Sequence, residues 1–398
     1  MILAAFPRSG YAPLTASDVI EAPEPEPEPE PPAPPEPWIV HPGATLPNGS
    51  VKSIEHMKVI DGVLYLAISG NWEGGSYPVA WVDLTTGTPT TGPMQPSEGF
   101  PVVRQLSSGR IIYPWVDPTG PWGDPQGYTY SDNGIAGPWE HQLIFPAYHV
   151  LDVREHGGAL WVCGAGPLNG VETAQVWKSE DGGDTWVRSF TATGGSLARV
   201  YSLLPVGDEL WIDPTATTVQ GPLRLEGDDW VQHEVPNDTG REPTNSSWHQ
   251  SGHVVSAGGV VYGRHGAFDG TRFIGYRLGG QQVGGAILPS WSDSTHIYAV
   301  PEASTSIVRA PLLTPGSPGV VEWEHWLSLG EGMAWRSAIS ATRHDGFVYV
   351  GGTQGRIWRL AAIEHVDNGD GSASIDTVGD SLLVVDNGDG SASIDTTA

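Results

Sequence analysis

The chain has a single cysteine and only three lysines among its 398 residues. A lone cysteine excludes an intrachain disulfide, and the place of Cys163 in the run Leu160-Trp161-Val162-Cys163 predicts a buried, unreactive thiol. Basic residues are scarce overall, since 19 Lys and Arg stand against 46 Asp and Glu, for a formal net charge of −27. A surface of that sign repels phosphate backbones and anionic lipid. We therefore expect no nucleic-acid partner and no membrane insertion.

Long apolar runs are also missing. No stretch approaches the roughly 18 apolar residues of a membrane helix, and the apolar start at residues 1–7 is too short for a secretion signal. The sequence has no phosphate-binding loop, dinucleotide fingerprint or serine-hydrolase elbow, and its 13 histidines show no metal-ligand spacing. We expect no cofactor and no metal ion.

Glycine and proline, in contrast, are abundant, with 53 and 35 residues, as is typical of turn-rich β structure. Seven short patches recur, each a turn followed by a strand with an aromatic residue in its middle: Tyr65, Tyr113, Trp161, Trp211, Tyr262, Tyr298 and Tyr349. The successive intervals are 48, 48, 50, 51, 36 and 51 residues. A strand-and-turn repeat of about 50 residues is typical of four-stranded propeller blades. The sequence therefore predicts an all-β fold, a seven-bladed β-propeller with the seven aromatics in equivalent second strands.

Two places in this ring carry further predictions. The interval of 36 residues between Tyr262 and Tyr298 predicts a blade with very short loops, for which residues 273–276 are the expected third strand. The last blade has no fourth strand after Leu360, so we expect residues 38–44 to supply it. A ring closed in this way leaves no exposed sheet edge.

The segments outside the propeller divide the chain into three regions: residues 1–37, 38–364 and 365–398. The first is an extended N-terminal arm whose residues 22–37 alternate proline with glutamate, and it reads either as a disordered spacer or as a tether to an anchoring segment. The last contains a 12-residue segment, Val366–Thr377, that recurs unchanged at Val385–Thr396. Each copy carries Asn-Gly between alternating residues, which predicts C-terminal β-hairpin repeats rather than a calcium loop.

The most specific motif lies at residues 179–186, with sequence Ser-Glu-Asp-Gly-Gly-Asp-Thr-Trp. It resembles the Asp-box of sialidase-like, BNR-repeat propellers, and a degenerate copy stands at Ser131–Gly134, followed by Trp139. The resemblance implies a structural role in the turn between third and fourth strands for Ser179, Asp181, Gly183, Thr185 and Trp186. In that family such boxes lie on the face opposite the active centre, so the motif supports the fold and not an activity.

Sialidases clamp a substrate carboxylate with three arginines, and the resemblance raises the question whether this chain does so. Arg104, Arg154 and Arg343 precede the inner turns and therefore belong to the Asp-box face. Arg199, Arg264 and Arg336 belong to loops on the opposite face and are the candidates for converging on a ligand. The family's amino-terminal arginine motif is missing from the first blade, and no nucleophile pair is recognisable. We assign no catalytic residue.

Aromatic residues in the loops of that face are the other candidates for binding. Trp72, Trp115, Trp122 and Trp248 would stack on sugar rings or anchor a protein partner, with capping of the blades as the alternative role for each.

The order of arm, tether, propeller and terminal repeats resembles accessory virion proteins of tailed bacteriophages. This resemblance implies a non-enzymatic structural and adhesive component of the phage particle, a tail or fibre protein located on the virion surface. Residues 1–37 would bind other virion proteins, and the propeller would bind a host-surface carbohydrate or another virion protein. The alternative is a glycan-cleaving, sialidase-like enzyme of the same fold.

Overall fold

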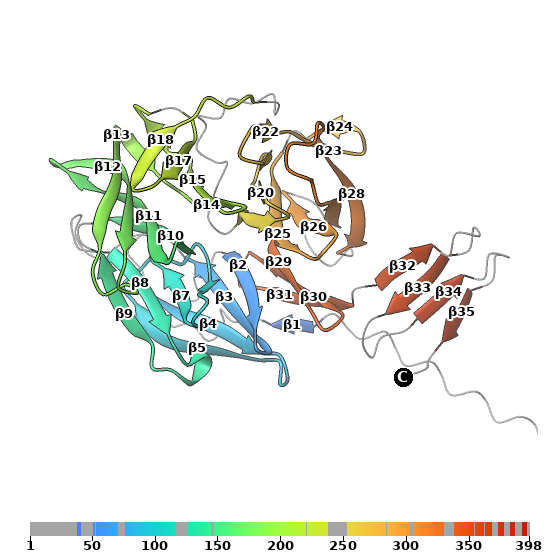
Figure 1. Ribbon diagram of the computed structural model, residues 1–398. Helices are drawn as coiled ribbons and strands as arrows, with labels where there is room; N and C mark the ends of the chain where they lie inside the picture. Colours follow the sequence, from blue (N-terminus) through green and yellow to red (C-terminus); the bar gives the residue numbers. More distant parts are fainter. Residues whose placement is uncertain are drawn as a thin grey trace, which may run out of the picture. The chain divides into compact units, whose positions relative to one another are not determined.

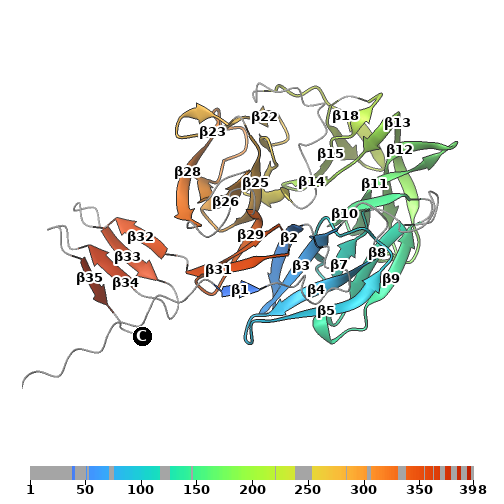
Figure 2. The ribbon, with the colours of Figure 1, turned by 180° about the vertical axis from the view of Figure 1, so that it is seen from behind.

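The computed structural model describes residues 38–40, 51, 53–70, 76–116, 126–144, 147–219, 221–237, 253–283, 285–302, 306–329, 338–353, 355–361, 363–367, 373–377, 383–386 and 392–395. Nearly all regular structure in these residues is β-strand. Seven sheets follow one another around a ring and form a seven-bladed β-propeller (Figures 1 and 2), so the predicted fold is confirmed.

The first four blades each begin with an inner strand and run outward by antiparallel pairing. Blade 1 consists of β2 (Ser53–Ile60), β3 (Val63–Ser69), β4 (Tyr77–Asp83) and β5 (Thr88–Gln95). Blade 2 consists of β6 (Arg104–Gln105), β7 (Ile111–Pro114), β8 (Gln126–Ser131) and β9 (Glu140–Ile144), with the 3-10 turn η2 (Gly134–Ala136) before its last strand. Blade 3 consists of β10 (His149–His156), β11 (Ala159–Leu168), β12 (Val171–Ser179) and β13 (Val187–Arg199), and β16 (Thr215–Thr217) pairs with its edge. Blade 4 consists of β14 (Leu203–Val206), β15 (Glu209–Ile212), β17 (Leu223–Glu226) and β18 (Asp229–Gln232).

The last three blades complete the ring. Blade 5 consists of β19 (Val255–Ala257), β20 (Val260–Tyr262), β21 (Ala267–Phe268) and β22 (Phe273–Ile274). Blade 6 consists of β25 (Ile287–Ser292), β26 (His296–Pro301), β27 (Ser306–Pro311) and β28 (Val321–Ser328), extended by β23 (Tyr276–Leu278) and β24 (Gln281–Gln282). Blade 7 consists of β29 (Ala338–His344), β30 (Phe347–Gly352), β31 (Ile357–Ala361) and β1 (Trp38–Val40).

The recurring aromatics occupy equivalent places, as predicted. All seven lie in the second strand of their blades, in β3, β7, β11, β15, β20, β26 and β30. Each is at most 3% exposed. These rings bury large apolar areas between neighbouring blades, so the residues that repeat in the sequence also form part of the hydrophobic core.

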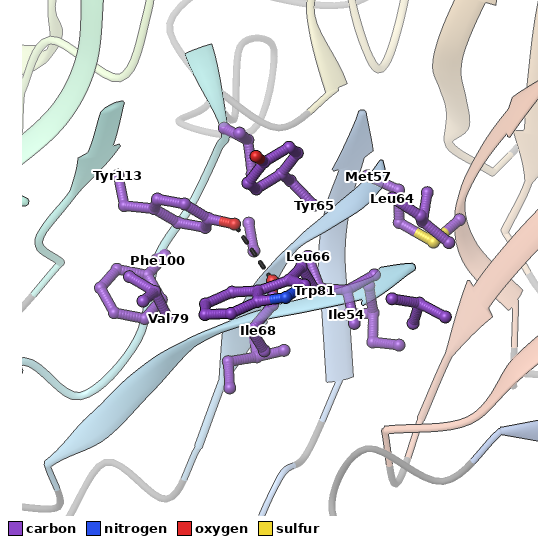
Figure 3. Packing of buried hydrophobic residues seen from close by; sticks show 14 of the residues in the cluster. Ile54, Met57, Leu64, Tyr65, Leu66, Ile68, Val79, Trp81, Phe100 and Tyr113 are labelled. Carbon is purple, nitrogen blue, oxygen red and sulfur yellow. Dashed lines mark hydrogen bonds between the residues drawn. The ribbon is translucent and has the colours of Figure 1, made fainter. Parts of the chain in front are cut away.

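Figure 3 shows this packing between blades 1 and 2. The Tyr113 hydroxyl donates a hydrogen bond of 3.1 Å to the main-chain oxygen of Ala80 on β4, which ties the second strand of blade 2 to the third strand of blade 1. The rings of Trp81 and Trp139 stack with centroids 6.0 Å apart, and Trp139 meets Tyr113 edge to face at 5.7 Å. Aromatic contacts of this kind hold neighbouring blades in register.

Ring closure also follows the prediction. β1 pairs antiparallel with β31 in the register Trp38↔Arg359, Ile39↔Trp358 and Val40↔Ile357. The first described strand of the chain therefore supplies the outer strand of the last blade, and Figure 1 shows the two side by side.

Blade 5 corrects one prediction. Residues 273–276 are not its third strand, because that place is taken by the two-residue β21. The segment is divided at Gly275 into β22, the fourth strand, and β23, which leaves the blade and pairs in parallel with β28 of blade 6. The short interval leaves room only for two- and three-residue strands in this blade.

The C-terminal repeats form a separate four-stranded sheet of β32 (Ile363–Asp367), β33 (Ala373–Thr377), β34 (Leu383–Asp386) and β35 (Ala392–Asp395). Each repeat is an antiparallel hairpin, with Asp367 opposite Ala373 in one and Asp386 opposite Ala392 in the other. By its contacts the chain divides into two units, Met1–Glu36 and Pro37–Ala398, and the first lies outside the described residues.

Candidate functional site

Strand connectivity gives the propeller two ends. The turns between first and second strands, such as Asp61–Gly62 and Gly157–Gly158, share one end with the connections between third and fourth strands. We call it the turn end. The connections between second and third strands and the links between blades lie at the other end, which we call the loop end.

The Ser179–Trp186 turn lies at the turn end and is held by its own side chains. The Ser179 hydroxyl donates to Asp181 at 2.7 Å and accepts from the Gly183 amide at 2.8 Å. Both the amide and the hydroxyl of Thr185 donate to the Asp181 carboxylate, at 2.8 and 2.5 Å. These bonds from Thr185 and Ser179 hold the pKa of Asp181 well below its usual range. Both oxygens of this carboxylate accept hydrogen bonds from the turn, so it is committed to local structure.

The same turn also joins blades 2 and 3. Gly183 has a φ of 108°, and a Cβ at this position would lie 2.5 Å from the Tyr128 hydroxyl of blade 2. Trp186 donates from its indole nitrogen to the Gly183 carbonyl at 3.0 Å and meets the Tyr128 ring edge to face at 6.2 Å. Arg110 of blade 2 donates to the Gly182 carbonyl at 3.3 Å. The geometry is that of a structural joint.

The loop end of blade 3 carries a compact polar group, which we call the His149 group: His149, Glu172 and Arg199. Glu172 Oε1 lies 3.3 Å from both His149 Nε2 and Arg199 Nε, and Arg199 Nη2 lies 3.1 Å from His149 Nε2. The other ring nitrogen of His149 bonds the Val116 carbonyl. The group is largely buried, since the side chains are 1%, 9% and 16% exposed.

The electrostatics of this group favour an ionised Glu172. Burial by itself raises the pKa of this carboxyl, but the hydrogen bond and charge of His149 and the charge of Arg199 outweigh burial and lower it. The group therefore holds a fixed carboxylate beside the Arg199 guanidinium, which donates, and beside Nε2 of His149. It can orient a polar ligand, but an ionised carboxylate is no proton donor.

Trp115, a predicted binding residue, enters this region as a core residue. Its side chain is 2% exposed, and its indole nitrogen donates to the Thr129 hydroxyl at 2.9 Å. Thr129 in turn donates to Gln95 at 2.6 Å. The expectation that Trp115 offers a ring face to a ligand is wrong, because the apolar ring is packed between blades and its polar atom is satisfied internally. Trp115 does position the site, since the residue after it, Val116, holds His149.

The remaining predicted residues are distributed as follows. Arg199 belongs to the His149 group, whereas Arg264 donates to Glu302 at 3.2 Å on blades 5 and 6. No contact among the described residues joins the two arginines. Trp72, Trp122, Trp248 and Arg336 lie outside the described residues. His149 and Glu172 were missed by sequence reasoning, and their only sequence signal is their position at the loop end of a strand, as the first residue of β10 and the second residue of β12.

Cys163 matches its prediction. It is fully buried on β11, and burial raises the pKa of its thiol, which therefore stays protonated.

Across the described residues no group of three or more His, Cys, Asp and Glu is placed to hold a metal ion. In the same part of the chain no helix has the length and hydropathy needed to cross a bilayer.

The chain matches no protein-family model and no curated protein. Among solved structures it is similar to an inactive variant of virginiamycin B lyase from Staphylococcus aureus with quinupristin, with a TM-score of 0.53 and 12% identity over 79% of this chain and 97% of that one. It also matches the GH93 α-L-arabinofuranosidase of Fusarium graminearum with arabinobiose, at a TM-score of 0.42 and 8% identity over 79% and 98%. At such identities the first likeness shows the propeller fold alone, and the second carries no argument.

Proposed function

We propose that this protein is a non-enzymatic binding propeller, a structural and adhesive component of a tailed-phage particle. Its propeller binds a host-surface glycan or another virion protein at the loop end, and residues 1–37 attach the chain to other virion proteins. The Ser179–Trp186 turn supports kinship with the sialidase-like, Asp-box propellers, since its side chains make the hydrogen bonds that this motif requires.

The observation that carries the binding role is the state of the His149 group. Glu172 is shared between two cationic or hydrogen-bonding partners at 3.3 Å, so the group is pre-organised for recognition and holds its carboxylate ionised. A glycosidase of the common type needs two carboxyls, one of them protonated, on either side of the scissile bond. Arg199 forms an ion pair with Glu172, and Arg264 forms one with Glu302. These internal pairs weaken the case for an arginine triad that binds a substrate carboxylate.

A glycan array combined with a reducing-sugar assay on the full chain tests this role. We expect binding without turnover, and a loss of at least tenfold in affinity for Arg199→Ala, because the buried Glu172 loses a charged partner. Arg309→Ala is the matched control, since Arg309 pairs with Glu324 on the outer strands of blade 6. Turnover that Glu172→Gln abolishes would instead establish the glycan-cleaving alternative.

The virion assignment has a separate test. Particles assembled with a chain that lacks residues 1–37 should not contain it, although the truncated chain binds glycans like the full chain. Equal incorporation of both chains would exclude anchoring through the arm.

A further inference from the structure

A second polar group lies among the inner strands of blades 1 to 3, and two of its members follow His149 on β10. Figures 1 and 2 show β2 and β10 toward the centre of the ring. Two polar contacts connect the three inner strands: the Val103 amide, next to β6, donates to His56 Nδ1 on β2 at 3.3 Å, and Arg104 of β6 pairs with Asp152 of β10 at 2.8 Å. Since His56 and Lys58 are two residues apart in a regular stretch of β2, their side chains point to the same side.

This inner basic group, Lys58, Arg104, Arg154 and Asp152, has more positive than negative charge. Asp152 is its only carboxylate and is fully buried, and both arginines pair with it, at 2.8 and 3.3 Å. The main-chain amides of Val153 and Leu203 also donate to Asp152, at 3.0 and 3.2 Å. Four donors thus use the acceptor capacity of one carboxylate, and none of it is left for Lys58.

Two donors of the group lack a partner. Arg154 Nη2 is buried and makes no hydrogen bond within the described residues. Lys58 makes no hydrogen bond or ion pair with any residue that the structure describes, whereas the surface lysine Lys178 pairs with both Glu180 and Asp228 at 2.8 Å. A buried donor without an acceptor is costly, and its presence in a native protein calls for an explanation, of which a bound ion or water is one.

The electrostatics agree with this geometry. Burial and then the charges of Arg104 and Arg154 lower the pKa of Lys58 to about 8. Burial, with the same arginines, also holds the pKa of His56 well below its usual range, so its ring stays neutral. Three cations around one carboxylate in the described part of a protein of net charge −27 are a local feature that the composition alone would not suggest.

We infer that the inner basic group is an anion-binding site for a single oxyanion, either a small soluble one or an acidic substituent of a larger ligand. Guanidinium and ammonium groups provide the donor geometry that sulfate, phosphate and carboxylate oxygens accept. The acidic exterior disfavours an extended polyanion, which would bring many like charges to the surface. The site is independent of the loop-end role proposed above.

Isothermal titration of the full chain with sulfate, at pH 7 and low ionic strength, tests the inference. We expect saturable binding that Lys58→Met and Arg154→Met each weaken at least tenfold. Lys178→Met, the control, should bind like the wild type. Parallel titrations with acetate and with glucuronate distinguish a small soluble oxyanion from an acidic substituent of a larger ligand. A preference for glucuronate over acetate points to an acidic sugar. Equal affinities in Lys58→Met and Lys178→Met, or no saturation beyond the effect of equal ionic strength in chloride, would overturn the site.

The wild-type protein provides a second readout that requires no variant to fold. Sulfate does not titrate between pH 7 and 9, and neither the neutral His56 and His253 nor Cys163, whose pKa burial raises, changes charge there. Burial lowers the pKa of Arg154 to about 10, so this guanidinium stays mostly protonated up to pH 9. Affinity should therefore fall at least fivefold as the pH rises through about 8 and Lys58 loses its proton. A constant affinity between pH 7 and 9 would count against Lys58 as a ligand.

Discussion

Lys58→Met is expected to raise the free energy of unfolding at pH 7, since it removes an uncompensated charge and keeps the apolar stem. Lowering the pKa of Lys58 from 10.5 in the unfolded chain to about 8 corresponds to about 3 kcal/mol of destabilisation of the charged folded state. Because Lys58 is only partly buried, screening by water reduces the expected gain to about 1–2 kcal/mol. A single substitution of an ordinary surface lysine would change the free energy of unfolding by less than that.

The dependence on pH distinguishes this effect from improved packing. Between pH 8 and 10.5 the unfolded chain binds the Lys58 proton and the folded protein does not, so wild-type stability rises with pH across this window. The free-energy cost of keeping Lys58 charged in the folded protein is fully present below pH 8 and is gone above pH 10.5. In paired urea titrations without added sulfate, the advantage of Lys58→Met should therefore shrink toward zero by pH 10.5, with Lys178→Met as the control. A variant that is less stable at pH 7, or whose advantage is independent of pH, would refute the reasoning.

Three further outcomes follow from the fold. Gly183→Ala should lower stability by about 1–3 kcal/mol in urea titrations, since it combines a positive φ with a Cβ 2.5 Å from the Tyr128 hydroxyl. A chain lacking residues 1–37 should melt within a few degrees of the full chain, whereas one lacking residues 1–52 loses β1 and should melt clearly lower. Trp115→Phe should cost about 1–3 kcal/mol through the lost bond to Thr129, as measured by chemical denaturation.

Most of the fold could be predicted because blade structure is local in sequence. The aromatic in each second strand has to be buried in every blade, so the pattern repeats at the length of one blade, from Tyr65 to Tyr349. The repeat holds in blade 5 at Tyr262, but its third strand was predicted wrongly because the strands of this blade are two or three residues long. A short apolar segment such as Phe273–Tyr276 can form either of two neighbouring strands. Which one it joins is decided by pairing with β28, about 45 residues away.

The sites were far less accessible to sequence reasoning. Trp115 reads as a loop residue because it directly follows a strand, but its burial depends on what packs over it in three dimensions, here His141 on the outer strand of the same blade, with ring centroids 5.5 Å apart. The inner basic group did leave a signal. Lys58 stands opposite Tyr65 and Arg154 opposite Trp161. The two cations thus occupy equivalent positions in blades 1 and 3, and an alignment of blades would have brought them together.

The opposite signs of the exterior and of the inner basic group act on ligands over different ranges. At an ionic strength of about 0.1 M, charges separated by more than about 10 Å through solvent are largely screened, so the acidic exterior of this chain, whose net charge is −27, acts mainly on ligands close to the surface. Lys58 and Arg154 are partly buried, and their attraction for a bound oxyanion is screened less. Raising the salt concentration therefore relieves the repulsion of acidic ligands by the surface while it preserves more of the attraction inside. A single acidic group on an otherwise neutral ligand meets this arrangement better than a polyanion does, because it gains the inner contacts without the accumulated repulsion.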